Sequence, residues 1–412
     1  MITSLKQKSN PFIIAWALGL LFYAVEYAVR SAPSIMMPQL TTVFSASLGT
    51  VSSIVGTYYL TYSLTSLAAG LAIDRLGAKY PLFVGVIILG IGCVLFSMAN
   101  TYSGYAGRLM QGMGSALAFP ACVYLAARAF SPRHLATAIG ATQSLGMIGG
   151  SAGQFLSAPI LKGGVSLISF WIGFGLIGFA IAALVYYFTP NPGENTVKAQ
   201  TKGNLFEPYK IVLSNPQSYL SGLVSGLLFS PTTIFAMTWG VAFFQSGRGL
   251  DYSTATIACA LVPMGWAVGC PLMGWLADKI GKRKPVLAAG AIAMALSLIQ
   301  LCYLPGLYSP YISMFILGVV SGAAMIPYSI IKEANPDNVK GSATGIINFL
   351  TFGVTSLLGP VFSHLYGTAI NNSTNTEAVF KQSLLFFVFI TLAAATVSLF
   401  LKETGSKRKT KQ

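Results

Sequence analysis

Charged residues are scarce in this sequence. Only 8% of its 412 residues are Asp, Glu, Lys or Arg, whereas 54% are hydrophobic. Because a soluble domain carries about 25% charged residues, this deficit indicates an integral membrane protein. The net charge is nevertheless +15 at pH 7. Since the basic residues form no extended stripe and no soluble domain carries them, we expect no nucleic-acid partner.

Cysteine and histidine are also few and scattered. Five cysteines lie singly in apolar segments, and the two histidines are far apart in the sequence. These spacings exclude a disulfide framework and offer no metal-ligand set. The sequence also lacks a glycine-rich nucleotide loop and a nucleophile–base set. We therefore expect no metal, no cofactor, no catalytic residues and no ATP-driven step.

Long apolar runs make up most of the chain. Runs of about 20 apolar residues are typical of transmembrane helices. The first run leads directly into Glu26 and is too long for a cleaved signal peptide, so we interpret it as a span. The sequence therefore predicts an all-α integral membrane protein with twelve transmembrane helices. They are centred in 11–37, 48–74, 81–99, 102–130, 134–160, 166–188, 217–245, 251–277, 285–304, 309–332, 340–365 and 381–401.

One polar segment divides the spans into two halves. Residues 189–216 contain Pro, Gly and Asn and form the longest connection between spans. We predict an N-terminal six-helix bundle at 1–188, a linker at 189–216, a C-terminal six-helix bundle at 217–401 and a basic tail at 402–412. No other stretch is long enough for an extramembrane domain, and we expect a monomer.

The distribution of Lys and Arg predicts the orientation in the membrane. Twenty of the 25 basic residues fall on one side of the predicted spans, three fall on the other side, and two lie within spans. Cytoplasmic loops carry the excess of Lys and Arg. We therefore predict that both termini and the linker are cytoplasmic, in a plasma (bacterial inner) membrane, with the lipid bilayer as the main partner.

A glycine and aspartate pattern occurs twice. "GLAIDRLGAK" begins at Gly70 and "GWLADKIGKRK" begins at Gly274, each between the second and third span of its half. The shared positions are separated by a constant 204 residues, and the same offset relates Gly114 to Gly318. Two copies at one offset indicate that the halves are structural repeats.

These loops resemble the signature loop of the major facilitator superfamily, G-x-x-x-D-R/K-x-G-R/K-K/R. "RLMQGMGSA" from Arg108 is similar to the fourth-helix motif of that superfamily, and "GMIGGSAG" from Gly146 is similar to its fifth-helix motif. The resemblance implies two pseudo-symmetric six-helix bundles that rock about a central cavity. Within the superfamily the chain looks most like the organic-anion and organophosphate carriers, through its helix-one acid, Arg30 and the following "SAPS".

The repeated loop predicts a conformational latch. Gly70 and Gly274 permit close helix crossing. Asp74 is placed to face the start of the eleventh span, and Asp278 the start of the fifth, where free N–H groups attract an anion. The alternative is that these are orientation charges and turn residues. The predicted latch consists of Gly70, Asp74, Arg75, Gly77, Gly274, Asp278, Gly281 and Arg128.

Three charged side chains fall within the spans. Glu26 and Arg30 lie in the first span and Arg108 in the fourth. Charge in hydrocarbon costs about 2.5–3.5 kcal/mol per residue on insertion scales, so such residues indicate a functional site. Helical spacing places further polar groups on the same faces as the arginines. These are Tyr23 and Tyr27 in the first span and Gln111 in the fourth.

Two arginines against one carboxylate leave an unmatched positive charge. A guanidinium grips carboxylate or phosphate through two hydrogen bonds, so the surplus predicts an anionic substrate. Glu26 either pairs with Arg30 until substrate arrives or takes up a proton that travels with the substrate. Two simpler interpretations stay open: a self-neutralising i,i+4 pair of Glu26 and Arg30, and a packing role for Arg108.

Polar, uncharged residues complete the predicted site. Pro231 in the seventh span is expected to loosen the helix and free backbone carbonyls. The remaining candidates come from the fifth, seventh, tenth and eleventh spans. They are Gln143, Ser230, Thr232, Thr233, Trp239, Tyr328 and Asn348.

Together these features predict a secondary active transporter, not an enzyme. It would move a small organic anion by alternating access, together with H+ through Glu26. A rival substrate class is a zwitterionic amino acid or short peptide, whose amine would meet Glu26. A different class of function is a non-transporting sensor or interaction protein on the same scaffold.

Overall fold

The computed structural model describes residues 11–130, 132–191, 206–336, 339–372 and 375–405, without the side chains of 74, 132–137 and 367–372. Residues 192–205 of the predicted linker and 406–412 of the basic tail lie outside these ranges. So do residues 1–10 and the side chain of Asp74. The described residues form helices and no strands.

The helices follow the predicted spans closely. The first half contains α1 (Pro11–Ser31), α2 (Met37–Val43), α3 (Leu48–Leu76), α4 (Lys79–Ser97), α5 (Thr101–Ser115), α6 (Ala118–Ala129), α7 (Pro132–Lys162) and α8 (Leu167–Phe188). The second half contains α10 (Glu207–Leu213), α11 (Pro216–Ser230), α12 (Gly240–Arg248), α13 (Tyr252–Ile280), α14 (Lys284–Tyr303), α15 (Pro310–Ser321), α16 (Ile326–Glu333), α17 (Lys340–Asn372) and α18 (Thr376–Ser398). Short non-α segments are η1 (Ala32–Ile35), η2 (Pro231–Trp239) and η3 (Gly322–Met325).

Length and hydropathy identify these helices as membrane spans. Ten helical segments of the described chain are long and apolar enough to cross a membrane, and the bent pair of α2 and α3, at 107°, makes an eleventh. In addition, α7 is 31 residues long and packs along α1. The all-α membrane fold predicted from the sequence is therefore confirmed, and these helices are consistent with twelve spans.

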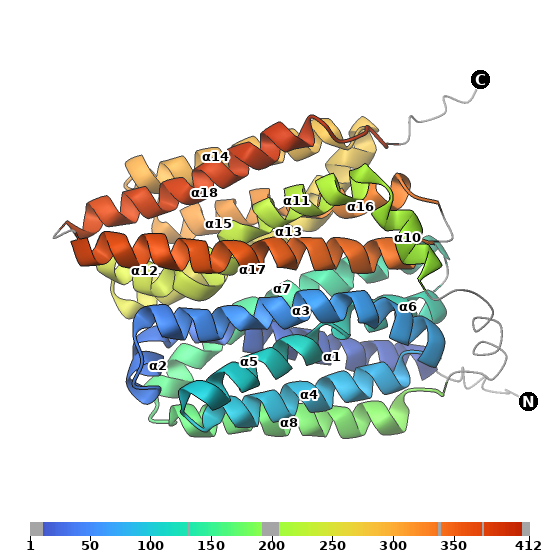
Figure 1. Ribbon diagram of the computed structural model, residues 1–412, viewed down its shortest axis with the longest axis horizontal. Coiled ribbons are helices and arrows are strands. Elements are labelled where there is room, and N and C mark those ends of the chain that lie inside the picture. Colours follow the sequence, from blue (N-terminus) through green and yellow to red (C-terminus); the bar gives the residue numbers. More distant parts are fainter. Residues whose placement is uncertain (1–10, 131, 192–205, 337–338, 373–374, 406–412) are drawn as a thin grey trace, which may run out of the picture.

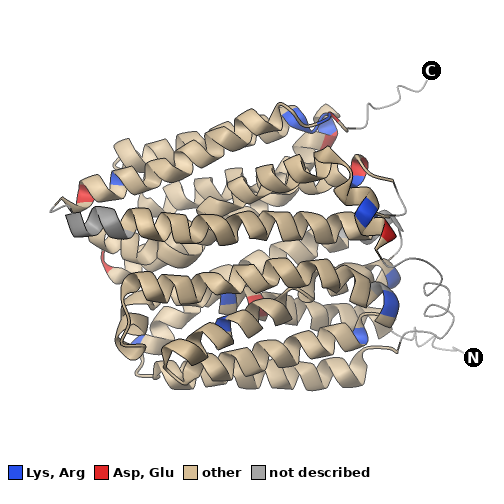
Figure 2. Ribbon diagram, in the orientation of Figure 1, with Lys and Arg blue, Asp and Glu red and all other residues tan. Residues whose placement is uncertain are grey.

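The helices form two bundles that lie against each other. Figure 1 shows α1 to α8 in one layer and α10 to α18 in the other. The main contacts between the layers are made by α3 with α17 and by α7 with α13. Most Lys and Arg residues gather at the end where α1 begins (Figure 2). We call this the basic end, which includes Arg75, Lys79, Arg128 and Lys284, and we call the other the opposite end.

Glycines bring α1 and α7 into close contact. A Cβ atom added at Gly149 would lie 2.3 Å from the Ala24 carbonyl oxygen, and one at Gly153 would lie 2.5 Å from the Ala28 Cα atom. Any side chain at these two positions would push the helices apart, because the clash is with backbone. The glycine-rich run in α7 thus sets the position of α1, which carries Glu26 and Arg30.

Helices that begin at the opposite end are capped by their own sequence. In each case a side-chain oxygen one residue before the helix accepts a hydrogen bond from a backbone N–H of the first turn, which stabilises the helix start. These caps are Ser47, Asn100, Ser166, Asp251, Ser309 and Asn375. At the basic end, α4 begins after Ala78 and has no side-chain cap.

Candidate substrate site

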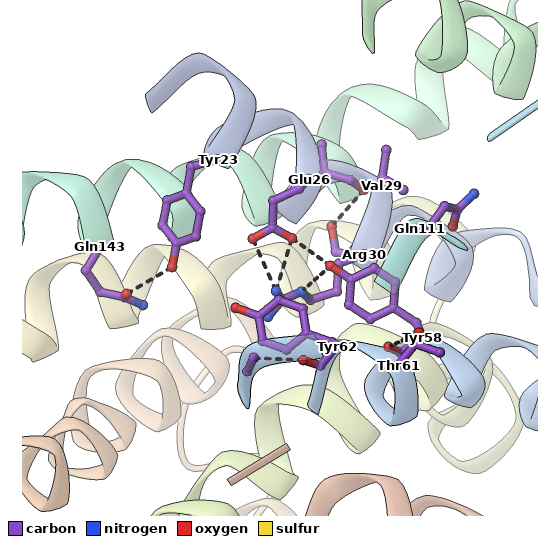
Figure 3. A network of polar contacts seen from close by, with 12 residues as sticks. Tyr23, Glu26, Val29, Arg30, Tyr58, Thr61, Tyr62, Gln111 and Gln143 are labelled. Carbon is purple, nitrogen blue, oxygen red and sulfur yellow. Dashed lines mark hydrogen bonds and ion pairs between the residues drawn. The ribbon is translucent and has the colours of Figure 1, made fainter. Parts of the chain in front are cut away.

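Glu26 and Arg30 form a buried ion pair on α1. The Arg30 Nη2 atom lies 3.0 Å from Glu26 Oε2 and 3.2 Å from Oε1. Tyr58 of α3 joins both groups, since its hydroxyl donates to Glu26 Oε2 at 2.7 Å and accepts from Arg30 Nε at 3.2 Å (Figure 3). Both charged side chains are almost completely buried. The spacing of four residues thus produces the i,i+4 pair, and a neighbouring helix holds it.

Arg108 of α5 binds backbone rather than a carboxylate. It donates to the Val55 carbonyl through Nε and Nη2, both at 3.3 Å, and to the Val29 carbonyl through Nη1 at 3.1 Å. Nη1 also donates to Gln111 Oε1 at 2.7 Å, and Gln111 donates onward to the Gly92 carbonyl at 3.2 Å. Arg108 therefore ties α5 to α1 and α3 behind the ion pair.

A small central cavity lies between the two bundles. Its volume is about 10 Å³, which is room for about one water molecule. Two hydrogen-bonded polar pairs line it: the Tyr23 hydroxyl donates to Gln143 Oε1 at 3.1 Å, and the Tyr328 hydroxyl donates to Asn348 Oδ1 at 2.6 Å. Tyr27 lines the same cavity. Polar groups from both halves thus meet at one point.

Aromatic rings separate Arg30 from this cavity. Its Cζ atom lies 4.1 Å from the ring centre of Tyr27, 4.6 Å from that of Tyr62 and 5.3 Å from that of Phe352. All three rings also line the central cavity. The guanidinium is therefore held by cation–π contacts directly behind the cavity wall.

A larger cavity of about 230 Å³ lies toward the opposite end. It lies between α3 and α17 and is lined by hydroxyl groups, including those of Ser52, Thr238 and Ser363, and by Trp239. Tyr59 lines it as well, and the Tyr59 ring stacks on Phe352 with their centres 6.2 Å apart. This stacked pair lies between the two cavities.

The segment after Pro231 is a π-helix, η2, instead of an α-helix. Its altered ladder leaves carbonyls for other partners, as expected from the proline. The Ala236 carbonyl accepts from Gln154 Nε2 of α7 at 2.8 Å, and the Thr233 carbonyl accepts from the Thr238 hydroxyl at 2.8 Å. A hydrogen bond between the two bundles is thus made possible by the loosened helix.

The structure distributes the ten predicted substrate residues over several places. Five line the central cavity: Tyr23, Tyr27, Gln143, Tyr328 and Asn348. Arg30 lies directly behind it and Trp239 lines the larger cavity. Arg108 and Gln111 lie behind the ion pair, and the Thr233 hydroxyl of η2 donates to the Phe229 carbonyl of the preceding helix α11.

Two further predicted residues pack inside the second bundle. The Ser230 hydroxyl donates to the Gly226 carbonyl, and the Thr232 hydroxyl accepts from the Trp266 indole N–H at 2.8 Å. Neither Ser230 nor Thr232 lines the central cavity.

Sequence reasoning missed the tyrosines of α3 and their aromatic partners. Tyr58, Tyr59 and Tyr62 stand in the run "TYYLTY" of the second span. Three hydroxyl groups in the middle of an apolar helix were the available signal, because a buried Tyr hydroxyl usually has a partner. Phe352 of α17 carried no signal of its own.

The latch residues of the first half lie where α3 ends. A Cβ at Gly70 would lie 3.9 Å from the Gly341 carbonyl oxygen of α17 and 4.0 Å from the Tyr209 hydroxyl. Tyr209 of α10 donates to the Leu67 carbonyl of α3 at 2.5 Å. The end of α3 therefore contacts both α17 and the linker helix α10, and Gly77 ends α3 with φ of 70°.

In the second half the loop charges pair within their own bundle. Asp278 accepts from Arg283 at 2.6 Å, and Arg283 also pairs with Glu333 at 2.9 Å. The predicted partner of Asp278 is the start of α7. The side chains of residues 132–137 there are not among those that the structure describes. Gly281 ends α13 with φ of 70°, whereas a Cβ at Gly274 would meet nothing within 4 Å.

The remaining two residues of the predicted latch are Arg128 and Arg75, each in the last turn of a helix. The Arg128 guanidinium lies 3.5 Å from the ring centre of Tyr124 on the same helix. Arg75 lies in the last turn of α3.

The chain matches the family model described as Major Facilitator Superfamily over residues 19–360 and 273–412. It therefore belongs to this superfamily of transporters, as its motifs and fold indicate. It is 24% identical to the membrane sensor protein UhpC of Escherichia coli (strain K12), over 82% of each chain. It is also 24% identical to the hexuronate transporter of Bacillus subtilis (strain 168), over 90% of each chain.

The fold is similar to that of a solved transporter. The structure of a bacterial homologue of the human lysosomal transporter Spinster, in an inward-facing and unoccupied conformation, superposes with a TM-score of 0.76. The match covers 96% of this chain and 97% of that one at 16% identity. This similarity concerns the fold alone.

Proposed function

We propose that this protein is a secondary active transporter of a small organic anion bearing a carboxylate or phosphate, moved with H+ by alternating access. The basic end would face the cytoplasm of a cell bounded by a plasma membrane. One observation carries the proposal. A guanidinium, that of Arg30, lies directly behind a central cavity that both bundles line.

The balance of charge supports an anionic substrate. The described residues inside the bilayer region carry one carboxylate, that of Glu26, and two guanidinium groups, those of Arg30 and Arg108, and only Arg30 is paired with Glu26. Arg108 already donates to carbonyl oxygens. The guanidinium whose partner a substrate could replace is therefore that of Arg30, and the partner is Glu26. When the bundles separate, substrate oxygens would replace Glu26 on Arg30, and proton uptake by Glu26 would keep that exchange neutral.

The hydroxyl-rich wall suits a substrate with hydroxyl groups. In the closed cavity the Tyr23 hydroxyl donates to Gln143 and the Tyr328 hydroxyl donates to Asn348. On opening, these groups would bind the neutral part of the ligand. A hexuronate, the substrate in the name of one relative, carries a carboxylate and several hydroxyls and is the first compound to test.

Uptake into vesicles of the purified protein tests the proposal. Hexuronates, sugar phosphates, amino acids and short peptides are compared with and without a pH gradient. We expect uptake of an acid or phosphate, and its loss in Arg30→Gln. Arg248→Gln is the matched control, because Arg248 lies at the opposite end and donates to the Leu301 carbonyl.

The Glu26→Gln variant separates coupling from binding. It should abolish accumulation driven by the pH gradient and retain exchange of internal for external substrate. Gradient-driven uptake equal to that of the original protein would exclude Glu26 as the proton carrier. Uptake of zwitterions alone would overturn the anion proposal.

A sensor is the second candidate function, because one relative is named a membrane sensor protein. The same vesicles distinguish the two. A sensor would be stabilised against heat by its ligand, by mass action, without moving the ligand across the membrane.

A further inference from the structure

A third cavity lies at the basic end, inside the first bundle. Its volume is about 90 Å³, and it is enclosed by the starts of α1 and α4 and the ends of α6 and α8. It shares no lining residue with the central cavity. The site is therefore separate from the proposed substrate path.

The charged side chains that line this cavity are both cationic: Lys79 and Arg128. Each lies against an aromatic ring, with Lys79 Nζ 5.0 Å from the centre of Tyr186 and Arg128 Cζ 3.5 Å from that of Tyr124. Within the described part of the chain, neither has a carboxylate partner. The cavity thus carries two positive charges that its described lining does not neutralise.

Backbone and side-chain donors face the same space. Residue Lys79 begins α4, a helix of 19 residues without a side-chain cap, and free N–H groups at a helix start attract anions. Thr189, at the end of α8, lines the cavity with only 2% exposure, and its hydroxyl has no hydrogen-bond partner among the residues that the structure describes. Buried hydroxyls normally have a hydrogen-bond partner. A ligand oxygen in this cavity would supply the acceptor for the Thr189 hydroxyl.

The second half shows what occupies the equivalent place there. Lys79 and Arg283 are 204 residues apart, the offset of the repeat. At Arg283, the carboxylate of Glu403 accepts from the Arg283 N–H at 2.6 Å and the Lys284 N–H at 3.3 Å, and so caps the start of α14. The second bundle therefore supplies its own anion where the first bundle has an uncapped helix start and a cavity.

Exposed aromatic side chains place the cavity at the depth of lipid headgroups. Tyr80 follows the lining residue Lys79, and Tyr187 lies two residues before the lining residue Thr189. Their side chains are 46% and 78% exposed, and tyrosines concentrate at the membrane interface. A phosphate is the anionic group of that layer. It offers oxygens for a guanidinium, an ammonium, a hydroxyl and a helix N-terminus at once.

We propose that this cavity binds a phosphate group, presented by the headgroup of an anionic phospholipid or by a soluble phosphate ester. The phosphate accepts hydrogen bonds at the start of α4, as the Glu403 carboxylate does at the start of α14. The site is independent of which solute the central cavity takes.

Thermal unfolding of the full-length protein in a neutral detergent tests this site. Phosphatidylglycerol is added in one arm, and glycerol phosphate and inorganic phosphate in another, with phosphatidylcholine as the reference lipid. We expect saturable stabilisation in one arm, which identifies the source of the phosphate. Stabilisation by neither arm would overturn the proposal.

Three variants locate the effect. Lys79→Gln and Thr189→Val should each weaken the phosphate response about tenfold, as expected for the loss of one hydrogen bond to a charged group. Thr189→Val should leave stability without phosphate unchanged or higher, because it removes an unpaired hydroxyl. Lys279→Gln is the matched control, since Lys279 lies at the same end over Trp275, with Nζ 4.8 Å from the ring centre. An equal response in Lys79→Gln and Lys279→Gln would exclude this cavity.

Discussion

Tyr58 is the residue on which the buried ion pair depends. Its hydroxyl is at once a donor to Glu26 and an acceptor from Arg30. A buried pair is stable only when further hydrogen bonds satisfy its polar atoms. Tyr58 supplies both of these bonds from a different helix, and so it links the state of the pair to the position of α3.

Tyr58→Phe is therefore expected to lower the free energy of unfolding by about 1.5–3 kcal/mol, the range for hydrogen bonds to charged groups. Equilibrium unfolding in mixed micelles measures this loss. Tyr59→Phe is the control, because the Tyr59 hydroxyl donates only a long bond of 3.5 Å to the Thr233 carbonyl. An equal loss in both variants would contradict a special role for Tyr58.

The sequence predicted the residues of this site better than their partners. The i,i+4 pair follows from helical spacing alone, and the structure contains it. The carbonyl ligands of Arg108 and the rings around Arg30 could not be predicted, because they come from helices whose rotation is set by packing. Whether these residues bind substrate stays a prediction.

At the scale of elements, the spans were predictable because the bilayer fixes their length. The short helices α2 and α10 were not, since a helix of seven residues depends on tertiary contacts for its stability. Pro231 indicated where the seventh span loosens, but the π-helical form of η2 and its bond to Gln154 required the structure.

Contact between α1 and α7 gives a prediction at this scale. Gly149→Ala should lower the free energy of unfolding by about 1–3 kcal/mol, because the new Cβ meets the Ala24 backbone. Gly140→Ala in the same helix is the control. Nothing lies within 4 Å of its added Cβ, so that change should stabilise by about 0.5–1 kcal/mol. Thermal melts that rank the two variants the other way would contradict this packing.

At the scale of the whole molecule, hydrogen bonds join the bundles on both sides of the central cavity. Toward the opposite end the hydroxyl oxygens of Ser52 and Ser363 lie 2.8 Å apart. Toward the basic end the Tyr209 hydroxyl of the linker helix α10 donates to the Leu67 carbonyl of α3. Figure 1 shows the two layers in contact along α3 and α17. Transport by rocking bundles requires each set of contacts to break in turn.

A disulfide across the opposite end tests this requirement. The double variant Ser52→Cys and Ser363→Cys should form a cross-link on oxidation, since the two hydroxyl oxygens are 2.8 Å apart. Oxidation should stop uptake into vesicles and reduction should restore it. Each single variant serves as a control, and undiminished uptake by the cross-linked protein would show that this end does not open.

The small volume of the central cavity has a kinetic consequence. At about 10 Å³, it has no room for a hexuronate or a sugar phosphate. If the proposed transporter passes through this closed form between two loads, it can reset without carrying a second solute back. Such a carrier would support net accumulation, whereas an obligatory exchanger would stall once its interior ran out of counter-solute.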